Sequence, residues 1–158
     1  MPASTSLTST GTFLTFNTLD EITLNQGSIL FNGTTDYLNY SGIIFGTNTF
    51  TVEFWFYFTG SSFTDVTAAP LGGNNSSNCL NLRFINSTTI QVDQSGISNQ
   101  KYTVSAMSPN IWYHFALVKN GTNMNVYING VGSTAQSNSV NYSGTTSRIG
   151  NNYDGTTN

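Results

Sequence analysis

The chain has 158 residues, enough for one domain with a substantial core, and 37% of them are hydrophobic and 13% aromatic. Only 7% are charged, against about a quarter in an ordinary globular protein, and the net charge is -3. The four basic residues are scattered, at Arg83, Lys101, Lys119 and Arg148. Duplex binding needs clustered Lys and Arg, and a spanning helix needs about 18 apolar residues in a row, so we expect no nucleic-acid binding and no membrane insertion.

The apolar positions predict an all-β protein. They are mostly β-branched or aromatic, lack a 3.6-residue period, and form short runs separated by Gly, Asn and Ser. Residues 1–25 are expected to form an N-terminal arm, in which 12–16 and 22–24 are candidate edge strands. The arm begins without a basic region and an apolar segment, so we find no signal peptide. Residues 26–158 are expected to form the domain itself.

Three strands are predicted in the first half of the domain. Residues 28–31 and 37–40 flank a turn at Asn32-Gly33, and residues 50–58 form the strongest strand. That strand places five Phe and Val side chains on one face, and Thr51, Glu53, Trp55, Tyr57 and Thr59 on the other. Because both faces carry aromatic residues, we expect a central strand whose Phe face is buried and whose second face is partly covered.

Two hairpins are predicted after it. Residues 80–85 and 89–93 pair across 86–88, and a short strand follows at 102–105. Residues 111–119 and 123–129 pair across Asn120-Gly121, which favours a type I′ turn, and Asn129-Gly130 ends the second strand. The inward side chains of that strand are Met124, Val126 and Ile128.

A resemblance to laminin-G-like and pentraxin-like domains is carried by residues 111–121, IWYHFALVKNG, and 124–131, MNVYINGV. Residues 28–33 (SILFNG), 50–56 (FTVEFWF) and 147–151 (SRIGN) are similar to three further strands of those domains, in the right order. The resemblance implies a two-sheet antiparallel jelly-roll sandwich of the concanavalin A-like lectin/glucanase superfamily. That fold hosts lectins, adhesion modules, hydrolases and structural proteins, so it does not fix the function.

The resemblance also implies a final strand that this sequence does not match after residue 151. An unfilled position in a sheet leaves backbone groups unpaired. We therefore expect the N-terminal arm, a continuation of the polypeptide or a neighbouring molecule to supply a strand.

Catalytic residues are not expected. The resemblance implies that glycosidases of this fold carry two or three carboxylates on one strand, with acid and nucleophile about 5–5.5 Å apart. This chain has Glu21 and Glu53 as its Glu residues, and Glu53 has no acidic neighbour in its strand. The one histidine, His114, falls at a family core position, and Trp55 and Trp112 are also expected in the core. The one cysteine, Cys79, excludes an internal disulfide and is expected to be buried.

Two types of site remain as candidates. No cofactor is required, but calcium is a candidate at Asp36 and Asp154, because the resemblance implies acidic residues there and hard cations take oxygen ligands. The alternative is that both residues cap turns. For a glycan, Asn151, Asn152 and Tyr153 combine a ring with amides on one loop, and residues 74–76 are a second candidate. The alternative is that an Asn-rich chain places Asn in every loop.

Three hypotheses for function follow. The leading one is a virion structural protein (capsid decoration, fibre or appendage subunit) with host-surface glycan binding, located in the virion or at an extracellular surface. Its partners would be other copies, other virion or surface proteins, and glycans. The second is a carbohydrate-binding module of a secreted adhesin. The third, an enzyme, lacks the carboxylates that it needs.

Overall fold

The computed structural model describes residues 15–16, 28–32, 35–41, 44–61, 63, 72–73, 78–94 and 98–150. Within these ranges every regular element is a β-strand, which confirms the all-β prediction, and no helix is long and apolar enough to cross a bilayer. The strands, in chain order, are β1 (Thr15–Phe16), β2 (Leu38–Ser41), β3 (Phe50–Tyr57), β4 (Gly72–Gly73), β5 (Asn81–Asn86), β6 (Thr89–Gln94), β7 (Ser98–Thr103), β8 (Trp112–Asn120), β9 (Asn123–Ile128), β10 (Val131–Gly132), β11 (Gln136–Ser137) and β12 (Thr146–Ile149).

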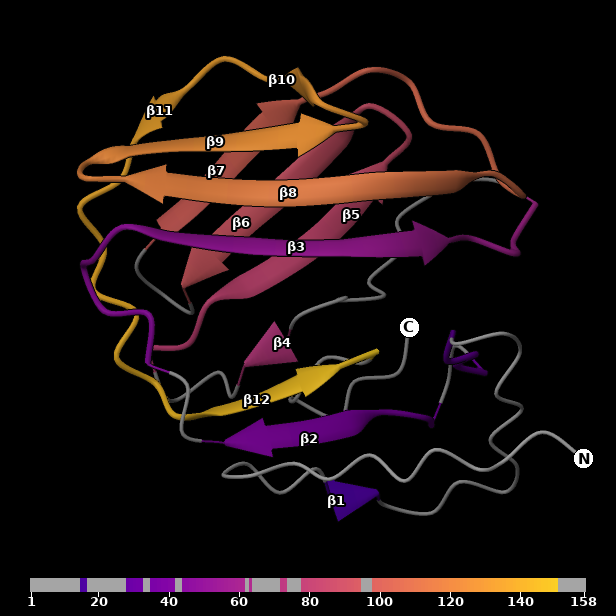
Figure 1. The fold of residues 1–158 in the computed structure, drawn as a ribbon, viewed down its shortest axis with the longest axis horizontal. Helices are drawn as coiled ribbons and strands as arrows, with labels where there is room; N and C mark the ends of the chain where they lie inside the picture. The colour runs from indigo at the N-terminus through magenta and orange to yellow at the C-terminus, as the bar shows by residue number, and fades with distance from the viewer. Residues whose placement is uncertain are drawn as a thin grey trace, which may run out of the picture.

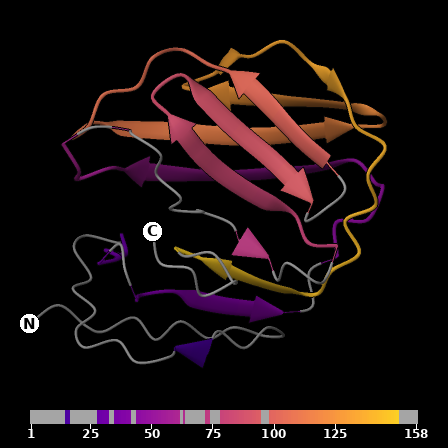
Figure 2. The same ribbon diagram turned by 180° about the vertical axis from the view of Figure 1, so that it is seen from behind.

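Two sheets form the body of the sandwich, and Figure 1 shows them as two layers whose strands cross at an angle. The front sheet has the order β10-β9-β8-β3, with β11 also pairing with β9. The back sheet is β5-β6-β7, which faces the viewer in Figure 2. All described pairings are antiparallel, so each strand presents one face to the opposite sheet and one face away from it.

The long strand β3 has the predicted alternation but not the predicted place. It pairs with β8 over eight residues, from Phe50 opposite Lys119 to Tyr57 opposite Trp112. We expected a central strand, but among the described strands β3 lies at the end of the front sheet. The aromatic residues on its second face misled the prediction, because that face is exposed and only the Phe face is covered.

The two Asn-Gly turns differ. Asn120 pairs with Asn123, so the β8–β9 loop consists of Gly121 and Thr122 and only Gly121 has positive φ, at 60°. A glycine at the first central position is typical of a type II′ turn, so the type I′ prediction was wrong here. At the β9–β10 turn both Asn129 (φ 51°) and Gly130 (φ 80°) are left-handed, as a type I′ turn requires.

The back sheet follows the predicted hairpin. β5 and β6 join through a turn in which the Asn86 side-chain oxygen accepts hydrogen bonds from the Thr88 backbone and hydroxyl, at 2.9 and 3.1 Å. β7 begins at Ser98, four residues before the predicted strand. The extension is possible because β6 offers its whole length for pairing, from Thr89 opposite Thr103 to Gln94 opposite Ser98.

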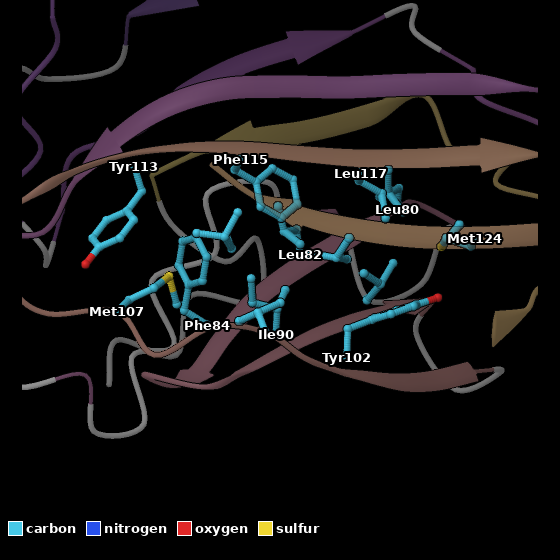
Figure 3. Packing of buried hydrophobic residues seen from close by; sticks show 14 of the residues in the cluster. Leu80, Leu82, Phe84, Ile90, Tyr102, Met107, Tyr113, Phe115, Leu117 and Met124 are labelled. Carbon is cyan, nitrogen blue, oxygen red and sulfur yellow. The ribbon is translucent and has the colours of Figure 1, made fainter. Parts of the chain in front are cut away.

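Aromatic and aliphatic side chains fill the space between the two sheets (Figure 3). Phe115 is fully buried, stacks on Phe54 at 4.8 Å and meets the edge of Phe84 at 6.3 Å. The predicted inward row of β9 is confirmed, since Met124, Val126 and Ile128 are all buried. Each such side chain contributes about 1.5–3 kcal/mol when it leaves water, so this layer is the main source of stability.

A third sheet, with the order β1-β2-β12-β4, lies beside this body in Figure 1. β1 comes from the N-terminal arm and pairs with β2, Thr15 opposite Asn39, which confirms an edge strand within residues 12–16. β2 pairs with β12 from the far end of the chain, Leu38 opposite Ile149. Of the predicted strand 28–31 only Ser28 makes a bridge, and Ile29 and Leu30 are exposed.

Buried polar groups tie the segment after β11 to the back sheet. The Asn138 amide donates to Gln100 Oε1 at 2.7 Å and to the Tyr142 hydroxyl at 2.9 Å. The Tyr102 hydroxyl donates to the same Gln100 oxygen at 3.0 Å. Burial raises the pKa of Tyr102 above its usual value, and the neighbouring Tyr142 adds to the increase. Tyr102 therefore stays protonated and keeps its donor role.

Cys79 is a free, buried cysteine, as predicted. Gly144 lies directly against it, because a Cβ on Gly144 would overlap the Cys79 sulfur. The backbone N–H of Gly144 also donates to the carbonyl of Asn78 at 3.0 Å. The thiol is thus part of the close packing that joins the segment before β5 to the segment before β12.

Candidate functional site: an aromatic face on the front sheet

The outward side of the front sheet carries a compact group of aromatic side chains, here named the aromatic face: Trp55, Tyr57, Trp112 and His114. The β3–β8 register places them as two cross-strand pairs, Trp55 opposite His114 and Tyr57 opposite Trp112. The ring centroids are 5.2 Å and 5.4 Å apart, with interplanar angles of 54° and 51°. The two pairs are neighbours along the strands, so four rings form one patch.

These rings are open to solvent. Trp55 is 65% exposed, Trp112 49% and Tyr57 41%. The expectation that both Trp residues lie in the core was wrong, and His114 also lies on the outward side rather than in the core. The reason is the strand period of two. Phe54, Phe56 and Tyr113 occupy inward positions, so Trp55 and Trp112 beside them must point away from the core. His114 lies between Tyr113 and Phe115, which both point inward.

The turn after β9 positions His114 in this face. The backbone N–H of His114 donates to Asn129 Oδ1 at 2.9 Å, and the backbone N–H of Asn129 donates to the His114 carbonyl at 2.9 Å. Asn129 makes both contacts from the left-handed conformation described above. This explains physically why a turn residue with a short amide side chain stands at the end of β9.

One carboxylate borders the aromatic face. Glu53 lies next to Trp55 on the same side of β3, and its Oε2 is 3.8 Å from His114 Nε2. The Glu53 side chain is 65% exposed, so solvent weakens this interaction. Among the described residues no second carboxylate lies on this side of the front sheet, and no group of three His, Cys, Asp or Glu is placed to bind a metal.

Neutral hydrogen-bonding groups on β9 lie at the same end of the aromatic face as Glu53, because Glu53 and Tyr127 are both in register with Ala116. On β9, Asn125 and Tyr127 point outward, with Asn125 Nδ2 3.3 Å from the Tyr127 hydroxyl. The Ser133 hydroxyl donates to Asn125 Oδ1 at 2.7 Å, and the Tyr127 ring lies close against Gly132. The aromatic face is therefore an apolar surface with a carboxylate and a rim of amide and hydroxyl groups at one end.

Asp36, the first candidate calcium ligand, is almost fully buried and makes turn contacts. Its Oδ2 accepts the backbone N–H of Asn32 at 3.0 Å, and its own N–H donates to Asn32 Oδ1 at 3.1 Å. Asn32 Oδ1 also accepts the backbone N–H of Thr35 at 2.9 Å. These reciprocal contacts match the alternative expectation that Asp36 caps a turn.

The other predicted site residues lie outside the described residues. These are the glycan candidates Asn151, Asn152 and Tyr153, the calcium candidate Asp154, and the second glycan candidate at residues 74–76. They stay predictions. The aromatic face, in contrast, was not predicted as a site, although the alternation in residues 50–58 already placed Trp55 and Tyr57 side by side.

A family model described as the concanavalin A-like lectin/glucanases superfamily matches residues 32–158. The chain belongs to this superfamily. A structure of mouse laminin alpha1 chain, domains LG4-5, is similar with a TM-score of 0.57 and 10% identity, over 75% of this chain. The match spans 32% of the laminin structure. A search of the curated proteins finds no match.

These similarities confirm the concanavalin A-like jelly-roll fold predicted from the sequence. At 10% identity the laminin structure supports the fold and nothing further. Any function must be argued from the residues of this chain, and the aromatic face is the feature that the described residues offer for that purpose.

Proposed function

We propose that this chain is a non-catalytic recognition module that binds carbohydrate on its aromatic face. The observation that carries the proposal is the exposure of Trp55, Tyr57 and Trp112 side by side on a rigid sheet. Exposed aromatic patches mark binding surfaces, and the C–H faces of pyranose rings pack on aromatic rings while their hydroxyls need polar partners. The rim of Asn125, Tyr127 and Glu53 supplies such partners.

The arrangement of charged groups supports a binding role rather than catalysis. Hydrolysis of a glycosidic bond needs two carboxyl groups across the scissile bond. The carboxylate of Glu53 has His114 as its neighbour. Of the other described carboxylates, Asp36 lies just before β2 and Asp93 lies on β6. Asp93 is buried and accepts a hydrogen bond from Gln91 at 2.8 Å.

We place this module, as a further part of the proposal, on a virion as a decoration, fibre or appendage subunit. A single buried cysteine and 7% charged residues fit a protein that folds without disulfides and then works outside the cell. The alternative setting is a module of a secreted adhesin, in which the same face would bind the same ligands.

The test is a broad glycan array on the folded 158-residue chain, in calcium and then in chelator. Binding to a set of glycans, lost in Trp55→Thr and Trp112→Thr, is the expected result. Ile44→Ala is the matched control, because Ile44 is 58% exposed but lies before β3 and outside the aromatic face. Binding that survives both Trp variants and is lost in Tyr153→Ala would move the site to residues 151–153.

Chelation separates the candidate calcium site from the aromatic face. The proposal expects binding to be the same in chelator, since the described part of the face holds a single carboxylate. Binding that disappears in chelator would implicate Asp36 and Asp154. No binding by folded protein in either condition would contradict a carbohydrate function.

A further inference from the structure

The charged residues around the aromatic face indicate which class of glycan it can bind. Every Lys and Arg of the chain lies within the described residues, so the position of each of these side chains relative to the face is known. Arg83 and Lys101 lie on the back sheet, where both are in register with Gln91 of β6. Arg148 belongs to the third sheet, with its guanidinium 3.9 Å from the centroid of the Tyr37 ring.

The fourth cation, Lys119, lies at the end of β8 but does not reach the aromatic face. It is buried opposite Phe50 and Met124, on the inward side of the front sheet. Its Nζ donates to the backbone carbonyls of Thr47 and Gly121, both at 2.7 Å. The ammonium group is thus used to hold the β8–β9 loop. No Lys or Arg side chain borders the aromatic face.

An anionic glycan would meet an unfavourable environment there. Proteins recognise carboxylates and sulfates with Arg or Lys, usually through paired hydrogen bonds. The aromatic face offers no such group, and it offers Glu53, whose negative charge lies next to Trp55 and His114. Uncharged sugars avoid this repulsion and still find hydrogen-bond acceptors and donors at the rim.

The spacing of the two ring pairs also indicates the length of oligosaccharide that the aromatic face can bind. Trp55 with His114 is one pair and Tyr57 with Trp112 is the next, two residues further along β3. Two residues of strand span about 7 Å, so the pairs are close enough for adjacent rings of one oligosaccharide and too far apart for one ring to cover both. A single sugar would engage one pair and leave the second in water.

We infer that the aromatic face takes an uncharged oligosaccharide and holds two consecutive sugar rings, one on each ring pair. This inference rests on the proposed carbohydrate function and adds the ligand class and the minimum length to it. The Trp55–His114 pair would hold the ring nearer to Glu53, and the Tyr57–Trp112 pair the ring farther from it.

Matched glycans test the ligand class. Lactosamine is compared with its sialylated and sulfated forms by titration against the full chain. Coulomb repulsion between unit charges about 4 Å apart in water corresponds to roughly fivefold in affinity, so we expect the neutral form to bind about fivefold tighter. Glu53→Gln should reduce this preference, while Ile44→Ala should leave it unchanged. Tighter binding of the acidic forms, still lost in Trp55→Thr, would overturn the inference and leave the proposed function standing.

Sugars of increasing length test the proposal that the face holds two consecutive rings. Glucose, cellobiose and cellotriose, and galactose with lactosamine, are titrated under the same conditions. Affinity should rise at least tenfold from one sugar to two and change little with a third. Equal affinity for single sugars and disaccharides in both series would overturn the two-ring arrangement. Absence of binding to every glycan would instead contradict the proposed function, and self-association lost in Trp55→Thr would then point to a protein partner.

Discussion

The two faces of the front sheet use the same residue class for opposite purposes. On the inward face Phe54 and Phe56 are partly buried and Phe115 is fully buried, and all three pack in the core between the sheets. On the outward face of the same two strands, Trp55 and Trp112 remain exposed. The comparison shows that aromatic content by itself does not distinguish a core from a binding surface. What distinguishes them is whether another layer lies on top.

The outward face of the back sheet differs from that of the front sheet, because it carries polar side chains that are buried. Asn81, Gln91 and Asp93 are polar and yet buried, and Gln91 donates to Asp93 within that face. Polar groups that leave water need hydrogen-bond partners, and the Gln91–Asp93 bond supplies one of them. The outward face of the front sheet therefore exposes aromatic rings, whereas the outward face of the back sheet buries Asn81, Gln91 and Asp93.

The largest expected effect comes from the inward face. Phe115→Ala removes a fully buried ring between Phe54 and Phe84 and leaves a cavity, so unfolding should become easier by about 3–5 kcal/mol. Chemical denaturation followed by circular dichroism measures this change. A decrease in the free energy of unfolding of less than about 1 kcal/mol would show that Phe115 is not closely packed on the inward face.

An intermediate effect is expected at the polar edge of the core. Tyr102→Phe removes the hydroxyl that donates to Gln100, at a cost of about 1 kcal/mol near neutral pH. The raised pKa of Tyr102 adds a pH dependence. Above the ordinary tyrosine pKa of 10.0 the unfolded chain loses its proton while the folded chain keeps it, so stability falls as pH rises.

The variant supplies the control for that pH dependence. Tyr102→Phe has no proton to lose at this position, so its stability should decline less steeply than that of the unmodified chain above pH 10. Denaturation midpoints at several alkaline pH values give both slopes. Parallel slopes would mean that Tyr102 does not carry the alkaline sensitivity.

The smallest effect on stability is expected on the outward face. Trp55→Thr keeps a residue suited to a strand and removes one cross-strand pair with His114, so the change should not exceed about 1 kcal/mol. The same denaturation experiment compares it directly with Phe115→Ala. A loss as large as that of Phe115→Ala would remove the distinction between the two faces and make any loss of glycan binding uninformative.

Several features followed from local patterns because they depend on nearest neighbours. The period of two in β3 and β9, the hairpins around residues 86–88 and 120–123, and the burial of Cys79 were all predicted. The type I′ turn was assigned to the wrong Asn-Gly. Because Asn120 pairs with Asn123, the two loop residues are Gly121 and Thr122 rather than Asn120 and Gly121. The local sequence does not determine this pairing register.

The sequence by itself determined that the chain is all-β, that it resembles the concanavalin A-like superfamily, and which side chains share a face. Only the tertiary structure decided that the second aromatic face of β3 stays uncovered, that β3 lies at the end of its sheet among the described strands, and that His114 contacts Glu53 and Trp55. The physical reason is that alternation is fixed by the geometry of one strand, whereas burial depends on what packs against it from elsewhere in the chain.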